Sequence, residues 1–140
     1  FEQSQQEAKA LGIAEMVLFC GNVNRPEDYL QAMDVFVMTS LFEGLPIVGV
    51  EAQASGLPCI FADTITQEVK ILPQTQFLAL TQPDEAWAER IVQTKPMERS
   101  LAGHCVESAG FAEENLDRQV CALYGMEEHH FANISGRDHL

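Results

Sequence analysis

Short apolar runs alternate along the chain with longer stretches that carry apolar residues at helical spacing. Runs of four or five apolar residues are typical of strands buried on both faces. They occur at residues 16–20, 35–38 and 58–61 and, more weakly, at 76–80. Helical spacing predicts helices over residues 2–11, 26–33, 46–55, 83–93, 97–108 and 112–124. Residues 125–140 carry neither pattern, and we interpret them as a C-terminal tail.

Proline and glycine residues mark the ends of several predicted helices. Pro26 and Pro46 fit the first helical turn, and Gly12 and Gly56 fit C-terminal caps. Strands that alternate with helices pair in parallel through crossover connections. The sequence therefore predicts an α/β fold, a Rossmann-like open parallel sheet with helices on both faces.

Ligands of such sheets bind at the carboxyl ends of the strands. In this chain that edge is expected to hold the segments 21–23, 39–40 and 62–64. Asp63 and Thr64 have two interpretations there, either as ligand contacts or as parts of a turn. These three segments therefore form the predicted binding region.

The most informative segment runs from Ser40 to Pro58. A helix that begins at Pro46 leaves its first N–H groups unpaired, and its dipole places a partial positive charge there. Gly44 and Leu45 add two N–H groups just ahead, and Gly44 lets a ligand approach the backbone closely. This arrangement predicts a site for a phosphate.

Two carboxylates, Glu43 and Glu51, flank the predicted phosphate site. Helical side chains tilt toward the N-terminus, so Glu51 can reach back toward the same mouth. A carboxylate beside a phosphate is repulsive unless it has another task, such as accepting hydrogen bonds from sugar hydroxyls. The pair therefore indicates a phosphorylated polyol as ligand. The alternative is that both side chains merely favour the helix N-terminus by their charge, and the spacing alone leaves both interpretations open.

Composition narrows the class of protein. The 140 residues suit one domain, and the net charge of −13 with only eight Lys and Arg residues excludes a basic nucleic-acid-binding face. The four cysteines form no CxxC pair, which indicates thiols in a reducing cytoplasm and no metal site. No apolar run is long enough to span a bilayer. A helical pattern from the first residue, with no initiating Met, predicts further sequence upstream.

Four segments, residues 17–23, 29–37, 40–46 and 51–58, resemble in order the GT-B retaining glycosyltransferases of family 4. Glu43 and Glu51 match the E-x7-E motif of that family. The similarity is closest to bacterial enzymes that build capsular and extracellular polysaccharide. It covers residues 1–124, which would form the C-terminal donor-binding domain, truncated on its N-terminal side.

The resemblance implies a role for each position of the motif. Glu43 would contact donor-sugar hydroxyls near the reacting carbon and is the candidate catalytic residue, while Glu51 would hold the ribose hydroxyls. The remaining expected donor contacts are the amides of Phe42, Gly44 and Leu45 at the distal phosphate and sugar, Ser40 beside the diphosphate, and the backbone of Gly21, Asn22 and Val23 around the base. No cofactor or metal is implied, and the expected substrate is a nucleotide-diphosphate sugar, most commonly linked to UDP.

The implied reaction moves a hexose, with retention of anomeric configuration, to a growing bacterial surface polysaccharide or glycolipid. The acceptor would bind through an N-terminal domain, and the whole protein would be cytoplasmic or peripheral at the inner face of the membrane. One feature departs from the family. The Arg/Lys pair that neutralises the diphosphate has no match, since Lys9 lies on a predicted surface helix and Arg25 in a different loop. We therefore expect the chain alone to bind donor weakly and to be inactive.

The residues leave two alternative functions open. The same fold serves non-catalytic modules that bind a nucleotide or a sugar phosphate, and these would keep the Glu51 and amide contacts. It also serves receiver or scaffold domains, for which only Asp63 is well placed among acidic residues. Finally, a truncated sheet with an exposed edge is expected to be prone to self-association.

Overall fold

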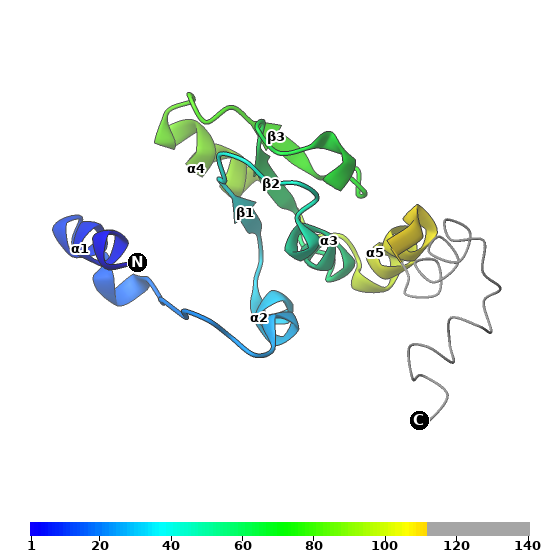
Figure 1. Ribbon diagram of the computed structural model, residues 1–140, viewed down its shortest axis with the longest axis horizontal. Helices are drawn as coiled ribbons and strands as arrows, with labels where there is room; N and C mark the ends of the chain where they lie inside the picture. Colours follow the sequence, from blue (N-terminus) through cyan, green and yellow to red (C-terminus); the bar gives the residue numbers. More distant parts are fainter. Residues whose placement is uncertain (112–140) are drawn as a thin grey trace.

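The computed structural model describes residues 1–111 (Figure 1). The helices are α1 (Glu2–Ala10), α2 (Pro26–Ala32), α3 (Ile47–Ala54), α4 (Asp84–Gln93) and α5 (Arg99–Val106). The strands are β1 (Phe36–Met38), β2 (Cys59–Ala62) and β3 (Gln76–Leu78). Three short helical turns complete the list, η1 (Ala14–Met16), η2 (Gln67–Val69) and η3 (Glu107–Phe111).

The three strands form one open sheet in the order β1-β2-β3, and both strand pairs are parallel. Parallel pairing requires a crossover between consecutive strands, which α3 supplies between β1 and β2. Figure 1 shows α3 and α4 on opposite sides of this sheet. The predicted α/β fold, an open parallel sheet with helices on both faces, is therefore confirmed.

The core is centred on β2, whose four residues are all buried. The ring of Phe61 lies between those of Phe36 and Phe77, with centroids 6.0 and 5.8 Å away. On α3, Gly49 faces this ring so closely that a Cβ atom there would lie 2.8 Å from it. The missing side chain thus allows the helix backbone to pack directly against the central strand.

The sequence predicts both ends of α3 to within one residue. Gly56 adopts φ +76°, and the N–H groups of Gly56 and Leu57 donate to the carbonyls of Gln53 (2.9 Å) and Ala52 (3.1 Å). This is the predicted glycine cap. At the other end, Pro46 was expected as the first helical residue, but its extended backbone (ψ 102°) makes it the N-cap.

A buried side chain, Gln53, ties α3 to the segment 69–75 that leads into β3. It is fully buried, and its amide nitrogen donates to the carbonyl oxygens of Gly49 (3.0 Å) and Val69 (2.7 Å). Its amide oxygen accepts three hydrogen bonds, at 3.0, 2.9 and 2.8 Å, from the Ile71 N–H, the Leu72 N–H and the Thr75 hydroxyl. An irregular segment is thereby hydrogen-bonded to the helix by one side chain.

The strand predicted over residues 16–20 is wrong. Met16 closes the turn η1, its N–H donating to the Ile13 carbonyl at 2.9 Å. The following residues 17–20 are not assigned to any strand of the described sheet, and Leu18 is 83% exposed. A strand needs a hydrogen-bonded neighbour and a buried face. Within the described residues this segment has no strand neighbour, so its apolar pattern alone does not make it a strand.

The other predicted helices agree with the structure within one or two residues at most ends. Pro26 begins α2, Pro83 is the N-cap of α4, and α5 lies inside the range predicted from residue 97 to 108. Trp87 of α4 packs against the core. The predicted helix over residues 112–124, the domain end at 124 and the tail at 125–140 lie outside the described residues.

Candidate functional site

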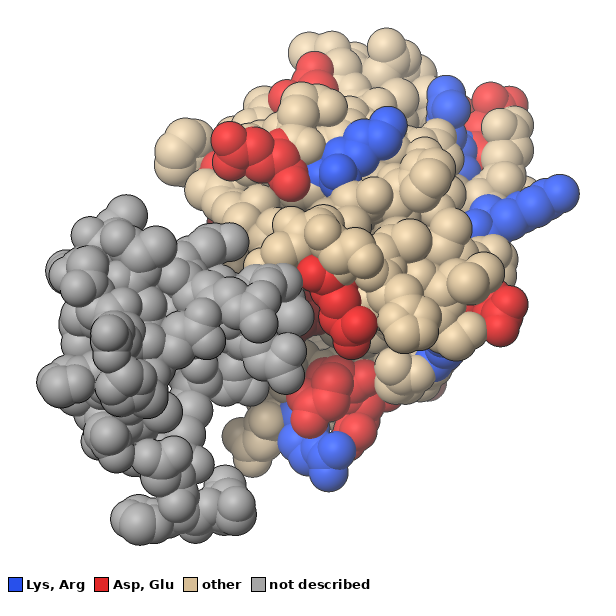
Figure 2. Space-filling view, turned by 90° about the vertical axis from the view of Figure 1, so that its right-hand side faces the viewer, with Lys and Arg blue, Asp and Glu red and all other residues tan. Residues whose placement is uncertain are grey.

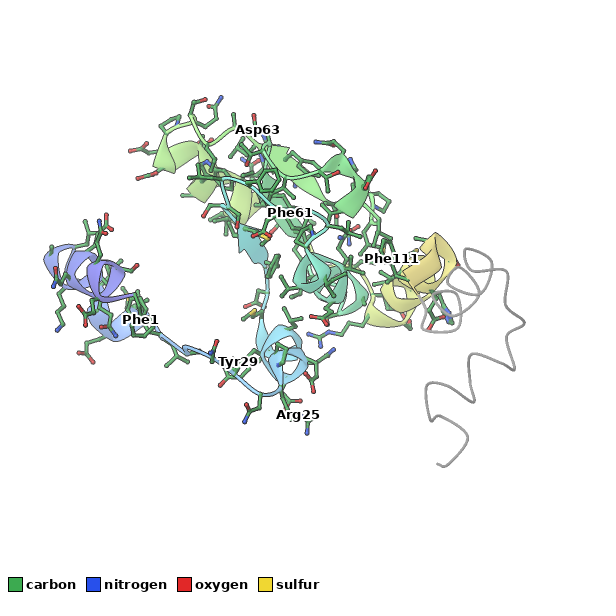
Figure 3. The ribbon with its side chains drawn as sticks, in the orientation of Figure 1. Phe1, Arg25, Tyr29, Phe61, Asp63 and Phe111 are labelled. Carbon is green, nitrogen blue, oxygen red and sulfur yellow. The ribbon has the colours of Figure 1, made fainter. Side chains whose placement is uncertain are left out.

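The carboxyl edge of the sheet is formed by the loops that follow the three strands. Residues 39–46 follow β1 and lead into α3, residues 63–66 follow β2, and residues 79–83 follow β3. Figure 3 shows Asp63 beyond Phe61 at the end of the central strand. The edge predicted to hold a ligand is therefore assembled in the structure from two of the three expected segments, 39–40 and 62–64.

The loop that carries the motif has no regular secondary structure, and few of its backbone N–H groups form hydrogen bonds with described residues. The N–H groups of Phe42, Gly44 and Leu45 donate to no described residue. The side chains of Leu41 and Phe42 are 82% and 85% exposed, so the loop is anchored through neither of them. Three backbone donors just ahead of a helix N-terminus remain free for an anion, as in the phosphate sites of other α/β folds.

Glu43 and Glu51 belong to the same loop-and-helix segment as these donors. Glu43 is half-buried in the loop, and Glu51 is exposed at the fifth position of α3. Neither carboxylate forms a hydrogen bond or an ion pair with a described residue. The carboxylate oxygens therefore keep their full capacity to accept hydrogen bonds from a ligand.

The stretch of sequence that carries the motif supplies no basic side chain, because residues 26–69 contain no Lys or Arg. Arg25 is itself paired, with Glu27 and Asp28 both at 3.1 Å, in the turn that begins α2. Lys9 lies on α1. Within this stretch, the groups that favour an anion are the backbone N–H groups and the dipole of α3.

The segment Gly21–Asn22–Val23, expected to frame a base, is not brought to this edge. It belongs to the extended stretch between η1 and α2. In Figure 1 that stretch runs from α1 to α2, away from the carboxyl ends of the strands. Residues 16–20 do not join the sheet. The residues that follow them are therefore not placed at its carboxyl edge.

Beside the motif loop, on the α4 side of the sheet, lies an open groove of about 580 Å³. Its lining is mostly apolar and includes Val37, Thr39, Leu41, Leu80, Gln82 and Trp87. Thr39 and Leu41 belong to the motif loop, so the groove adjoins the candidate site.

The face drawn in Figure 2 shows how the described charged residues are distributed. On the side drawn in Figure 2, Lys and Arg residues are separated from one another by acidic and uncharged residues. Among residues 1–111 no group of three or more His, Cys, Asp or Glu residues is placed to hold a metal ion. In the same range no helix has the length and apolar character required to cross a membrane.

Sequence comparison connects this site with known proteins. The family model described as "Glycosyl transferases group 1" matches residues 2–94. The chain is 47% identical over 90 residues to a putative glycosyltransferase EpsF of Bacillus subtilis, covering 64% of this chain and 23% of the relative. It is 35% identical over 122 residues to the Vi polysaccharide biosynthesis protein VipC/TviE of Salmonella typhi, covering 81% of this chain and 20% of the relative.

A third relative carries a substrate in its name. The chain is 42% identical over 53 residues to a UDP-Gal:alpha-D-GlcNAc-diphosphoundecaprenol alpha-1,3-galactosyltransferase of Escherichia coli, over 38% of this chain and 14% of the relative. This chain thus spans about a quarter or less of the length of the curated relatives it matches. No solved structure matches it significantly.

Proposed function

The chain belongs to the group 1 glycosyltransferases, and on this basis we propose that it is the donor-binding part of a retaining enzyme. The donor would be a nucleotide-diphosphate sugar, carried by UDP, and the transferred group a hexose. The acceptor would be a growing bacterial surface polysaccharide or a lipid-linked saccharide, bound outside this chain. Relatives named for polysaccharide biosynthesis and for transfer to a diphosphoundecaprenol-linked sugar support this choice of acceptor.

One observation carries the proposal. Three backbone N–H groups that donate to no described residue precede α3, and two carboxylates without a described partner lie in the same segment, Glu43 among these residues and Glu51 on α3. Amide donors suit phosphate oxygens, and carboxylates suit hydroxyl groups. A nucleotide-diphosphate sugar presents both kinds of group within one molecule.

In the proposed complex each residue has a separate task. The amides of Phe42, Gly44 and Leu45 bind the distal phosphate, where negative charge develops on the leaving group as the glycosidic bond breaks. Glu43 accepts hydrogen bonds from the sugar hydroxyls and orients the reacting carbon, and Glu51 does the same for the ribose. Ser40 would lie beside the diphosphate, and Gly21–Val23 would reach the base only after a change from the described arrangement.

The alternative is a non-catalytic module that binds a nucleotide or a sugar phosphate. It would keep the contacts to Glu51 and the loop amides and would have no need of Glu43. This alternative would be favoured if the chain binds a nucleotide and if Glu43→Ala leaves its affinity for a sugar nucleotide unchanged.

Calorimetric titration of the chain with UDP, GDP and ADP tests the proposed donor class. We expect UDP to bind, and Glu51→Ala to weaken that binding by more than about 1 kcal/mol, the scale of a charge-assisted hydrogen bond. Glu89→Ala is the matched control, because Glu89 is another exposed glutamate within a helix, on α4 and away from the motif. Equal loss in both variants, or none in either, would contradict the placing of ribose at Glu51.

A transfer assay with labelled donor and a saccharide acceptor tests catalysis separately. Because the Arg/Lys pair of the family has no match in this sequence, we expect donor binding without turnover. Turnover by this chain at the rate of a full-length relative would overturn the proposal that it is inactive alone.

A further inference from the structure

A single hydrogen bond fastens the motif loop to the rest of the described protein. The Thr64 hydroxyl donates to the carbonyl oxygen of Ser40 at 2.8 Å. No other hydrogen bond joins residues 40–45 to any described residue. Ser40 opens the loop whose next residues carry Glu43 and the free amides, so this bond acts directly on the candidate donor site.

Thr64 is itself held in place from both sides. The Asp63 N–H donates to the Leu78 carbonyl of β3 at 3.0 Å, which continues the pairing of the sheet beyond β2. The Ile65 N–H donates to the Ala62 carbonyl at 3.0 Å, and the Ile65 side chain is buried in the core. Thr64 therefore occupies a turn whose backbone is fixed, while its own side chain is exposed.

We propose that Thr64 is a positioning residue for donor binding, an inference that rests on the proposed function. Its hydroxyl holds the Ser40 carbonyl and so fixes the start of the loop without consuming any of the three free amides. A loop that is ordered before binding loses less conformational entropy when the ligand arrives. Without the hydroxyl, the same amides and Glu43 remain present but lose their common anchor.

Two substitutions separate this role from a structural one. Thr64→Val removes the hydroxyl but keeps the β-branched shape, and Thr64→Ser keeps the hydroxyl. With UDP as probe in calorimetry, we expect Thr64→Val to weaken binding about three- to tenfold, the effect of one hydrogen bond, and Thr64→Ser to stay within about twofold. Because the residue is exposed, the Tm of both variants should remain within about 3 °C of the original protein.

Thr66→Val is the matched control. Thr66 stands two residues further on, and its hydroxyl accepts only the Glu68 N–H at 3.4 Å, within its own turn. We expect this variant to bind UDP as the original protein does. Unchanged binding by Thr64→Val would overturn the proposal. Equal loss in Thr64→Val and Thr64→Ser would also overturn it, because Thr64→Ser keeps the hydroxyl to which the proposal assigns the effect.

Backbone ¹⁵N relaxation provides a readout that needs no ligand. Thr64→Val should lower the order parameters of residues 41–45, while Thr64→Ser and Thr66→Val leave them unchanged. If the original protein binds none of UDP, GDP and ADP, the proposed function fails, yet the relaxation data still decide whether Thr64 orders the loop. Unchanged order parameters in Thr64→Val would overturn the inference whatever the ligand result.

Discussion

Replacing Gln53 by leucine should destabilise the protein far more than its conservative volume change implies. The substitution removes five hydrogen bonds from a side chain that is fully buried. The Gly49 carbonyl lies within α3 and Ile71 is only half-buried, whereas the Val69 carbonyl, the Leu72 N–H and the Thr75 hydroxyl are left without their buried partner. An orphaned buried polar group costs about 1–3 kcal/mol, so these three together cost about 3–6 kcal/mol after partial relaxation.

That loss is a large share of the total, because domains of this kind are stable by only about 5–15 kcal/mol. Urea unfolding followed by tryptophan fluorescence measures it, since Trp87 is the only tryptophan and packs against the core. Gln6→Leu is the matched control, because Gln6 is exposed on α1, and it should change the free energy of unfolding by less than about 0.5 kcal/mol. A Gln53→Leu variant within 1 kcal/mol of the original protein would refute the reasoning, since that value is smaller than the cost of a single orphaned group.

Two further predictions concern the packing of α3 and β2. Gly49→Ala should destabilise the protein by about 1–3 kcal/mol in the same assay, because its Cβ would lie 2.8 Å from the Phe61 ring. Gly103→Ala on α5 is the control: its Cβ would meet no described atom within 4 Å, so the change should be neutral or stabilising. Equal effects at the two sites would contradict the packing argument. Burial raises the pKa of the Cys59 thiol to about 12, so at pH 8 iodoacetamide should modify the exposed Cys20 and Cys105 and spare Cys59, as mass spectrometry of peptides can show. Because the folded pKa lies above the ordinary value of 9.0, this thiol should also favour the folded state below pH 9 and cease to do so as the pH rises toward 12.

The parts of the fold that could be predicted from sequence are those set by local chemistry. Pro46 and Gly56 bracket α3 because proline and glycine restrict or free the backbone at single positions, and this places the helix within one residue. The apolar residues at 58–61 became the buried β2 because neighbouring strands pair with them on both sides. The equally apolar residues 16–20 have no such neighbour in the described chain. A strand forms only where a second segment pairs with it, so the apolar pattern of one segment cannot predict the pairing.

The same division holds for the candidate site. Glu43, Gly44 and Glu51 could be chosen as candidates from their positions relative to a predicted helix start, although the spacing alone left two interpretations open and only the family resemblance favoured one of them. The bond between Thr64 and Ser40 joins residues 24 positions apart, and only the parallel register of β1 and β2 brings them together. Gln53 did leave a signal, since it lies four residues after the buried Gly49 on an otherwise apolar helix face. A polar residue on such a face requires buried partners, but its partners at residues 69–75 could not be named in advance.

The bonds made by Gln53 also bear on where the chain can accept added sequence. Residues 70–75 contain neither helix nor strand, and by that criterion they would be chosen as a place to graft a peptide or a fluorescent tag. Their backbone is nevertheless held in place, since two of their N–H groups donate hydrogen bonds to the Gln53 amide oxygen. The turn at residues 81–83 is exposed, and neither of its two backbone hydrogen bonds, from the Gln82 N–H to the Ala79 carbonyl and from the Ala86 N–H to the Pro83 carbonyl, spans the link between Gln82 and Pro83. An insertion there should leave the fold intact, whereas one between Ile71 and Thr75 should unfold it.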